Sequence, residues 1–102
     1  MLPPGASPYA RTAEFTEATV PPGLLRAHTT KAGAWGLIHV LDGRLAYRIT
    51  DPRRPVAETV LEAGGPPGVV EPTILHEVEP LGPVRFYVEF LRVSEEPGEA
   101  DS

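Results

Sequence analysis

The chain has 102 residues, nine basic and fourteen acidic side chains, a net charge of −5 and no cysteine. That length fits one domain, and the lack of cysteine excludes disulfides, thiolate metal sites and cysteine nucleophiles. The basic residues are scattered, which argues against nucleic-acid binding because such binding requires a basic stripe or patch.

The first eight residues contain three prolines, one glycine and no basic residue. They therefore lack the charged and apolar regions of a signal peptide. No apolar run approaches the ~20 residues that a membrane-crossing helix needs. We expect a cytoplasmic protein that does not bind a membrane, with residues 1–8 forming a flexible N-terminus.

Thirteen prolines and ten glycines divide the chain into short segments. An internal proline costs a helix ~3 kcal/mol, so this density excludes long helices. The segments between these breakers are predicted to be strands. In chain order they are 14–19, 24–28, 35–41, 44–50, 57–61, 69–71, 75–79 and 84–93. This pattern predicts an all-β sandwich or small barrel over residues 9–93. Residues 94–102 carry four acidic residues and no large apolar one, which predicts a disordered acidic tail.

Two tight turns are expected between these strands. Asp42-Gly43 is the dipeptide that a type I′ hairpin turn favours, so it is predicted to join 35–41 to 44–50. A second turn is expected at 81–83, where a glycine precedes a proline. In 44–50, Leu45, Tyr47 and Ile49 alternate with polar or small residues, which predicts one buried face and one face that is wet or nearly so.

The three histidines are the first candidates for chemistry. His28 and His76 lie at predicted strand–loop junctions, where the rims of barrel pockets form. His39 lies inside a predicted strand, and we expect it to be a packed or surface residue. The spacing of His28 and His76 matches no short metal motif, and a divalent metal usually takes three or four protein ligands.

Glu89 is the candidate for a third ligand. It lies in the otherwise apolar run 86–90, where a charge is costly unless it is paired or bound to a cation. Strand alternation places Tyr87 and Glu89 on one face of this strand. If that face lines the pocket, Glu89 is a ligand or proton acceptor; if it faces water, Glu89 is an ordinary surface residue.

The aromatic residues complete the predicted site. The predicted pocket-lining residues are Trp35, Tyr47, Tyr87 and Phe90. The chain has neither a catalytic Ser-His-Asp order nor a dinucleotide fingerprint, and the turn at Gly64-Gly65 lacks the helix start that a phosphate-binding loop needs. We therefore expect no nucleotide cofactor and assign no catalytic residue.

Four runs of the sequence carry a family resemblance: 28–36, 40–43, 71–79 and 86–90. Together they resemble a small cupin family, found alone in YeaR-like proteins or fused ahead of the methyltransferase in some tellurite-resistance protein B (TehB) chains. The resemblance covers nearly all of residues 8–93. It implies a cupin-type double-stranded β-helix, or jelly-roll barrel, a homodimer, and a link to tellurite or to oxidative and nitrosative stress. No glycine-rich βα unit follows, so methyl transfer is not implied.

The sequence departs from the general cupin pattern at the first metal motif. Gly36 stands where the pattern has a glutamate ligand, and Thr30 and Ala32 stand near the positions of the histidine pair. The histidine of the second motif carries over onto His76, whereas His28 matches the small family's own pattern. The resemblance therefore implies at most a reduced metal site of His28, His76 and Glu89.

Three functions remain open at this point. The first is a metal-binding cupin that holds Zn, Ni, Fe or Mn and a small polar molecule or oxyanion in its pocket. The second is a non-catalytic domain that binds a small ligand where the metal site has degenerated, as Gly36 in place of the glutamate favours. The third is a regulatory partner of a separate methyltransferase.

Overall fold

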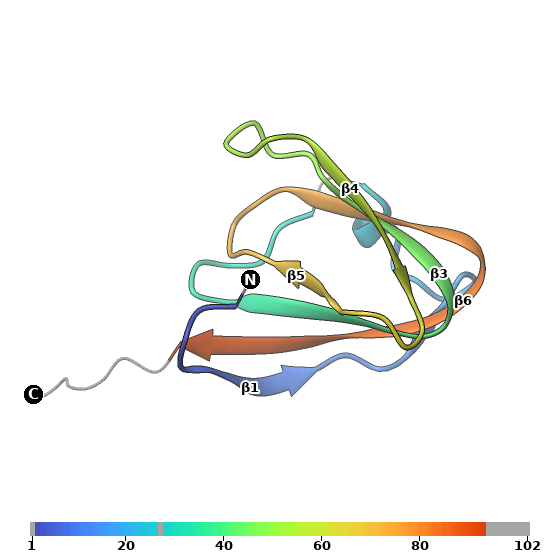
Figure 1. Ribbon diagram of the computed structural model, residues 1–102, viewed down its shortest axis with the longest axis horizontal. Coiled ribbons are helices and arrows are strands. Elements are labelled where there is room, and N and C mark those ends of the chain that lie inside the picture. The colour runs from blue at the N-terminus through green and yellow to red at the C-terminus, as the bar shows by residue number, and fades with distance from the viewer. Residues whose placement is uncertain (1, 27, 94–102) are drawn as a thin grey trace, which may run out of the picture.

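The computed structural model describes residues 2–26 and 28–93. Over these residues the protein is all-β, as predicted, with one short 3-10 helix (Figure 1). The elements in order are β1 (Ala6–Arg11), β2 (Phe15–Thr16), η1 (Pro22–Leu25), β3 (Trp35–Ile49), β4 (Ala57–Glu62), β5 (Gly68–Val70) and β6 (His76–Val93). Within this part of the chain, no helix has the length and apolar character needed to cross a membrane. The predicted acidic tail, 94–102, lies outside the described residues.

Strands β3 and β6 form the centre of a single antiparallel sheet. The sheet order is β1-β6-β3-β4, with β2 also pairing with β6 and β5 with β3. The register between β3 and β6 runs from Trp35 opposite Leu91 to Ile49 opposite His76. Figure 1 shows both long strands curving round at one end of the molecule, so that their two halves lie on opposite sides of the interior. One curled strand pair therefore supplies both walls of the core.

The hairpin predicted at Asp42-Gly43 is wrong, because these residues lie inside β3 and the strand continues through them. Gly43 has a φ of 76°, and it pairs with Val84 between two irregularities in the register. The turn predicted at 81–83 likewise lies inside β6, where Gly82 has a φ of 108°. Left-handed glycines serve bulges as well as turns. Here both strands bend at these glycines and stay paired, because β6 supplies hydrogen-bond partners for β3 on both sides of the bend.

The N-terminal third also differs from the prediction. Residues 6–8 belong to β1 and pair with β6, so the sheet begins before residue 9. Pro8 is tolerated there because β1 is the first strand in the sheet order, and proline is confined largely to edge strands. Of the predicted strand 14–19 only Phe15–Thr16 is a strand, and the first two residues of the predicted strand 24–28 belong to η1. The predicted strand at 57–61 is confirmed.

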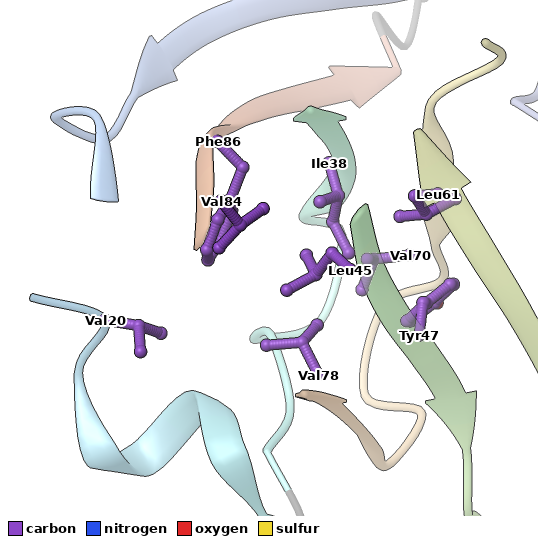
Figure 2. Packing of buried hydrophobic residues seen from close by; sticks show 9 residues of the cluster. All are labelled: Val20, Ile38, Leu45, Tyr47, Leu61, Val70, Val78, Val84 and Phe86. Atoms are coloured by element: carbon purple, nitrogen blue, oxygen red, sulfur yellow. The ribbon is translucent and has the colours of Figure 1, made fainter. Parts of the chain in front are cut away.

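The core is the concave side of the bent sheet. Figure 2 shows side chains from β3, β4, β5 and β6 meeting Val20, with Leu45 and Phe86 fully buried among them. Leu45 and Tyr47 are buried as the alternation predicts, but Ala46 is buried as well, with 2% exposure. The expectation that the opposite face of this segment is wet is therefore wrong at Ala46.

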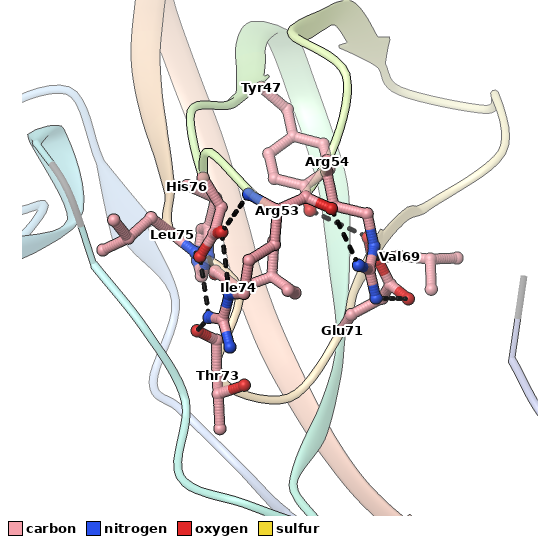
Figure 3. Close-up of polar contacts among 10 residues, drawn as sticks. Tyr47, Arg53, Arg54, Val69, Glu71, Thr73, Ile74, Leu75 and His76 are labelled. Atoms are coloured by element: carbon pink, nitrogen blue, oxygen red, sulfur yellow. Dashed lines mark hydrogen bonds and ion pairs between the residues drawn. The ribbon is translucent and has the colours of Figure 1, made fainter.

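A buried carboxylate fastens the turn after β3 to the segment that leads into β6. Asp51, which is 2% exposed, accepts hydrogen bonds from the backbone N–H, Nε and Nη2 of Arg53 and from the backbone N–H of Leu75. Arg53 Nη2 also donates to the carbonyl of Thr73 at 2.6 Å, a contact visible in Figure 3. Thr73 itself has a φ of 65°, which is unusual for a threonine. These contacts of Asp51 and Arg53, called the Asp51 clamp below, hold this strained residue and so fix the start of β6 at His76.

Replacing Gly43 with alanine should destabilise the fold severely. An added Cβ would lie 2.0 Å from the Pro83 carbonyl oxygen, in a backbone conformation that L-residues avoid. Gly64→Ala is the matched control, since Gly64 has a φ of 82° but no atom within 4 Å of the added Cβ. We expect a loss of about 1–2 kcal/mol in the control from the left-handed conformation, and about 3 kcal/mol or more at Gly43, where sterics add. Urea unfolding measures both; equal losses would contradict the role given to Gly43.

The Asp51 clamp should make the fold sensitive to acid. Hydrogen bonds from the Arg53 guanidinium, and then from the backbone N–H groups of Leu75 and Arg53, hold the pKa of Asp51 well below its ordinary value of 3.8. The ionised carboxylate therefore stabilises the fold above that ordinary value, and this contribution is lost as the pH falls below it. We expect the free energy of unfolding of the wild type to fall between about pH 5 and about pH 2.

The variant Asp51→Asn should be less stable at neutral pH and should vary less with pH over that range. Asp42→Asn is the control, because the Asp42 side chain is 70% exposed and pairs with Arg85 at the surface. It should behave like the wild type. A wild type and an Asp51→Asn variant with parallel pH profiles would rule out the clamp as the source of acid sensitivity.

Candidate functional site

A pocket of about 260 Å³ opens between the inner face of the sheet and the segment that carries η1. Its walls are mostly apolar, and its polar lining is limited to two threonines and two histidines. The apolar wall includes Phe15, Leu24, Ile38, Phe86, Val88 and Phe90. No charged side chain is among the described residues that line it.

The two predicted histidines meet at this pocket. The backbone N–H of His28 donates to the His76 carbonyl at 2.8 Å, and the N–H of His76 donates to the His28 carbonyl at 3.0 Å. Their rings lie edge to face with centroids 5.4 Å apart. His76 is 5% exposed and is the first residue of β6, opposite Ile49 of β3. A bridge between distant parts of the chain therefore places both imidazoles at one end of the pocket.

The protonation of His76 is set by its neighbours. Its Nδ1 lies 3.0 Å from the carbonyl oxygen of Ile74. A carbonyl oxygen only accepts, so Nδ1 carries the proton and Nε2 has a free lone pair in the neutral ring. Burial lowers the pKa of His76 below 6.5, and the neighbouring His28 lowers it further, against the opposing effect of the Ile74 hydrogen bond. His76 is therefore neutral at neutral pH and presents Nε2 as an acceptor.

The other polar groups around the pocket are already engaged. Thr30 Oγ1 donates to the Ala34 carbonyl at 2.7 Å. Thr12 Oγ1 donates to the carbonyl of Ala13 and accepts from the backbone N–H of Val88. Tyr47, whose ring lies edge-on to His76 at 5.8 Å, donates its hydroxyl proton to the Val69 carbonyl. The two threonines of the described lining therefore have no hydroxyl proton left for a ligand, and the imidazoles are its remaining polar side chains.

Glu89 lies on the other face of the sheet. Its carboxylate contacts His39 Nε2 at 2.9 Å, and His39 stacks on Tyr87 with centroids 4.8 Å apart. The Arg11 guanidinium lies 3.8 Å from the centre of the Tyr87 ring. The alternation of β6 places Phe86, Val88 and Phe90 in the pocket and Tyr87 and Glu89 outside it.

The predicted convergence of His28, His76 and Glu89 is therefore wrong. Among residues 2–26 and 28–93, no group of three or more potential metal-ligating side chains comes together. The structure brings His28 and His76 together but separates Glu89 from them, and it gives Glu89 a contact with His39 that sequence reasoning missed. A metal role for the two pocket histidines stays a prediction.

The predicted aromatic lining is only partly correct. Phe90 lines the pocket, whereas Tyr47 borders a separate hollow near Leu61 and Gly68. Tyr87 belongs to the outer cluster, and strand alternation puts Trp35 on the same side as His39. Sequence reasoning missed the apolar strand residues Ile38, Val70, Val78, Phe86 and Val88. It also missed residues of the segment before β3, notably Thr12, Phe15 and Leu24. Their short, irregular elements give no periodic signal that could have marked them.

Gly36 explains part of the difference from a standard cupin site. A Cβ added there would lie 3.2 Å from the Cβ of Val70 and 3.6 Å from Cγ1 of Val88. A side chain at position 36 would thus point into the packed interior between β5 and β6. The glutamate that the general cupin pattern expects at this position has no room without a shift of these two valines.

A second hollow, of about 320 Å³, adjoins the histidine end of the pocket. It shares His28, Thr30 and Phe90 with the pocket and extends to Tyr9 and Lys31. Lys31 is thus in the adjoining hollow and is not among the residues that line the pocket. His28 lies between the two spaces and borders both.

Comparison with solved structures places this fold beside known proteins. TehB from Haemophilus influenzae is similar, with a TM-score of 0.79 and 26% sequence identity over 88% of this chain and 32% of that one. The chain thus spans 32% of the length of that protein. A protein from Escherichia coli strain K12 has the same fold, with a TM-score of 0.80 and 22% identity over 93% of this chain and 98% of its own.

At the level of sequence, no curated protein matches the chain. The model of the TehB-like domain family, however, matches residues 10–88, most of the chain and nearly all of the sheet described above. The match includes both pocket histidines and three further pocket-lining residues of β6, namely Val78, Phe86 and Val88. The chain therefore belongs to the TehB-like domain family.

Proposed function

We propose that this chain is a cupin-type domain that binds a small ligand in the pocket between η1 and the inner face of β3 and β6. The observation that carries the proposal is a mostly apolar pocket of about 260 Å³ with two adjacent imidazoles at one end. Ligand sites combine apolar walls with a few placed polar groups in this way. Membership of the TehB-like family supports a role linked to tellurite resistance or to the stress response.

The cupin-type barrel is the architecture that fits this proposal. Strands β3 and β6 curl far enough for their two halves to face each other across the core. A double-stranded β-helix is built from antiparallel pairs that bend in this manner. The pocket then corresponds to the interior of the barrel, closed on one side by the segment that carries η1.

Binding without catalysis is the form of the proposal that the side chains favour. Catalysis by nucleophile or by acid and base needs paired groups within hydrogen-bond reach of a reacting atom. The imidazoles of His28 and His76 are the titratable groups of the described pocket lining. Gly36, in the position of the expected glutamate, leaves the interior to Val70 and Val88.

A divalent metal on the two histidines is the second candidate function. The observation that favours it is the hydrogen bond from His76 Nδ1 to the Ile74 carbonyl, since metal-ligating histidines usually donate their other N–H in this way. Two histidines leave a Zn, Ni, Fe or Mn ion with open positions, which water or an oxyanion would fill. Such a metal would act as a Lewis acid on that molecule.

Two further expectations concern partners. TehB is a longer protein, since the match covers 32% of its chain. A role of the present chain beside a separate methyltransferase is therefore a further possibility. The homodimer and the cytoplasmic location stay predictions.

Filling the pocket should abolish ligand binding. Leu24 is half-buried and lines the pocket, whereas its neighbour Leu25 is 42% exposed and does not. We expect para-ethyltoluene, para-ethylphenol or para-ethylbenzoate to shift the NMR methyl signals of Ile38, Val70 and Val88. Leu24→Trp should weaken that binding at least ~10-fold, because a larger side chain overfills the space. Leu25→Trp should not. Equal effects of the two variants, or no shift with any of the three compounds, would reject the pocket as a ligand site.

Metal content separates the two candidate functions. The protein is supplemented with Zn, Ni, Fe or Mn, desalted, and its metal content is measured by elemental analysis. Binding of the small ligand alone predicts far less than one metal per chain. The second candidate predicts near-stoichiometric metal that is lost in His76→Ala and retained in His39→Ala, since His39 lies on the opposite face. Metal retained by His76→Ala would exclude these histidines as the ligands.

A further inference from the structure

We infer that the ligand of this pocket is a neutral, mostly apolar molecule about the size of one substituted ring, which donates a hydrogen bond from a hydroxyl or N–H group to Nε2 of His76. The inference rests on the proposed function, because it names the class of molecule that the pocket would hold. The expected ligand is therefore a hydrogen-bond donor and not a free oxyanion.

The size and lining of the pocket set the first condition. A cavity of about 150 Å³ lined by leucine, isoleucine and phenylalanine binds benzene. The present pocket has about 260 Å³, enough for a ring with a substituent. Phe15 and Phe86 meet edge to face at 5.7 Å and both line the pocket, together with Phe90. Aromatic walls of this kind favour a flat apolar ligand through edge-to-face contacts.

The second condition on the ligand is set by the hydrogen-bonding groups at the histidine end of the pocket. Nε2 of His76 is the nitrogen left to accept, because Nδ1 already donates to the Ile74 carbonyl. The backbone N–H groups of His28 and His76 donate to each other's carbonyls. The threonine hydroxyl protons are also engaged. A ligand that donates a proton therefore satisfies Nε2, whereas a ligand that only accepts does not.

The His28 ring makes a hydroxyl group especially suitable. Every imidazole ring carries at least one N–H donor, so His28 can donate where His76 accepts. A hydroxyl can donate to His76 and accept from His28 at the same time. A carboxylate or another oxyanion offers acceptors alone and would place its charge beside the lone pair of Nε2.

Charge gives the third condition. No aspartate, glutamate, lysine or arginine is among the described residues lining the pocket, and Lys31 borders the adjoining hollow. A charged ligand would lose its water without gaining a counter-ion inside the pocket, which is costly. The chain as a whole carries a net charge of −5, which further opposes the approach of an anion.

The experiment compares three probes of matched shape on the metal-free full chain at neutral pH, by NMR titration of the pocket methyl groups. Para-ethylphenol carries a donor, para-ethyltoluene has a methyl group in its place, and para-ethylbenzoate carries an anion. We expect para-ethylphenol to bind about 3- to 10-fold more tightly than para-ethyltoluene, which is the effect of one hydrogen bond. Para-ethylbenzoate should bind more weakly than either.

Variants test which nitrogen is responsible. His76→Leu removes the acceptor but keeps an apolar side chain, so the preference for para-ethylphenol over para-ethyltoluene should fall to about one. The control His39→Leu removes a histidine on the opposite face and should leave the preference unchanged. If His76→Leu does not fold, the wild-type ratios still decide whether the pocket prefers a donor. The ¹⁵N signal of His76 Nε2 in the wild type then decides the assignment, because it should shift with para-ethylphenol and not with para-ethyltoluene; equal shifts would overturn it.

The outcomes separate this inference from the proposed function. Tighter binding of para-ethylbenzoate, or equal binding of para-ethylphenol and para-ethyltoluene, would overturn the inference while leaving the pocket a ligand site. Binding of none of the three probes would overturn both. A preference for para-ethylphenol that survives in His76→Leu would also overturn the assignment to Nε2.

Discussion

The antiparallel pairing of β3 with β6 is the constraint on which the rest of the structure depends. The two strands stay paired from Trp35 and Leu91 to Ile49 and His76, with two irregularities in the register at the bend where Gly43 meets the Pro83 carbonyl. Because the pairing survives the bend, one strand pair forms both walls of the core. Strands β1, β2, β4 and β5 attach to this pair, and none of them pairs with another in the described sheet.

This pairing also decides which side chains form the site. The alternation of β6 places Phe86, Val88 and Phe90 toward η1 and the pocket. The same alternation sends Glu89 outward, where it pairs with His39. A charge in an apolar strand is stabilised by a partner or a cation, and here the partner is a histidine from the neighbouring strand. The acidic residue that looked most like a metal ligand is thus accounted for on the opposite face of the sheet.

The histidine end of the pocket is fixed by backbone contacts more than by side chains. The paired N–H and carbonyl groups of His28 and His76 join the segment before β3 to the start of β6. The Asp51–Arg53 clamp holds the residues just before His76, and the Ile74 carbonyl selects the tautomer of its ring. His76 lines an otherwise apolar space, and its Nδ1 proton is already donated to a carbonyl, so Nε2 is the nitrogen left to accept a hydrogen bond. This arrangement is why we favour a ligand that donates a hydrogen bond.

The sequence by itself determined the all-β class and the strand at 57–61, and its motifs led to the TehB-like family. It also singled out His28 and His76, which the structure brings together. Density of proline and glycine, β-rich composition and motif order are local properties, so they can be read without a structure. The tertiary structure alone decided that Gly43 bends a strand instead of reversing it, because only the position of β6 supplies partners on both sides of the bend. It also decided which face of β6 lines the pocket, since alternation separates Tyr87 and Glu89 from Phe86 and Phe90 without saying which pair is inside.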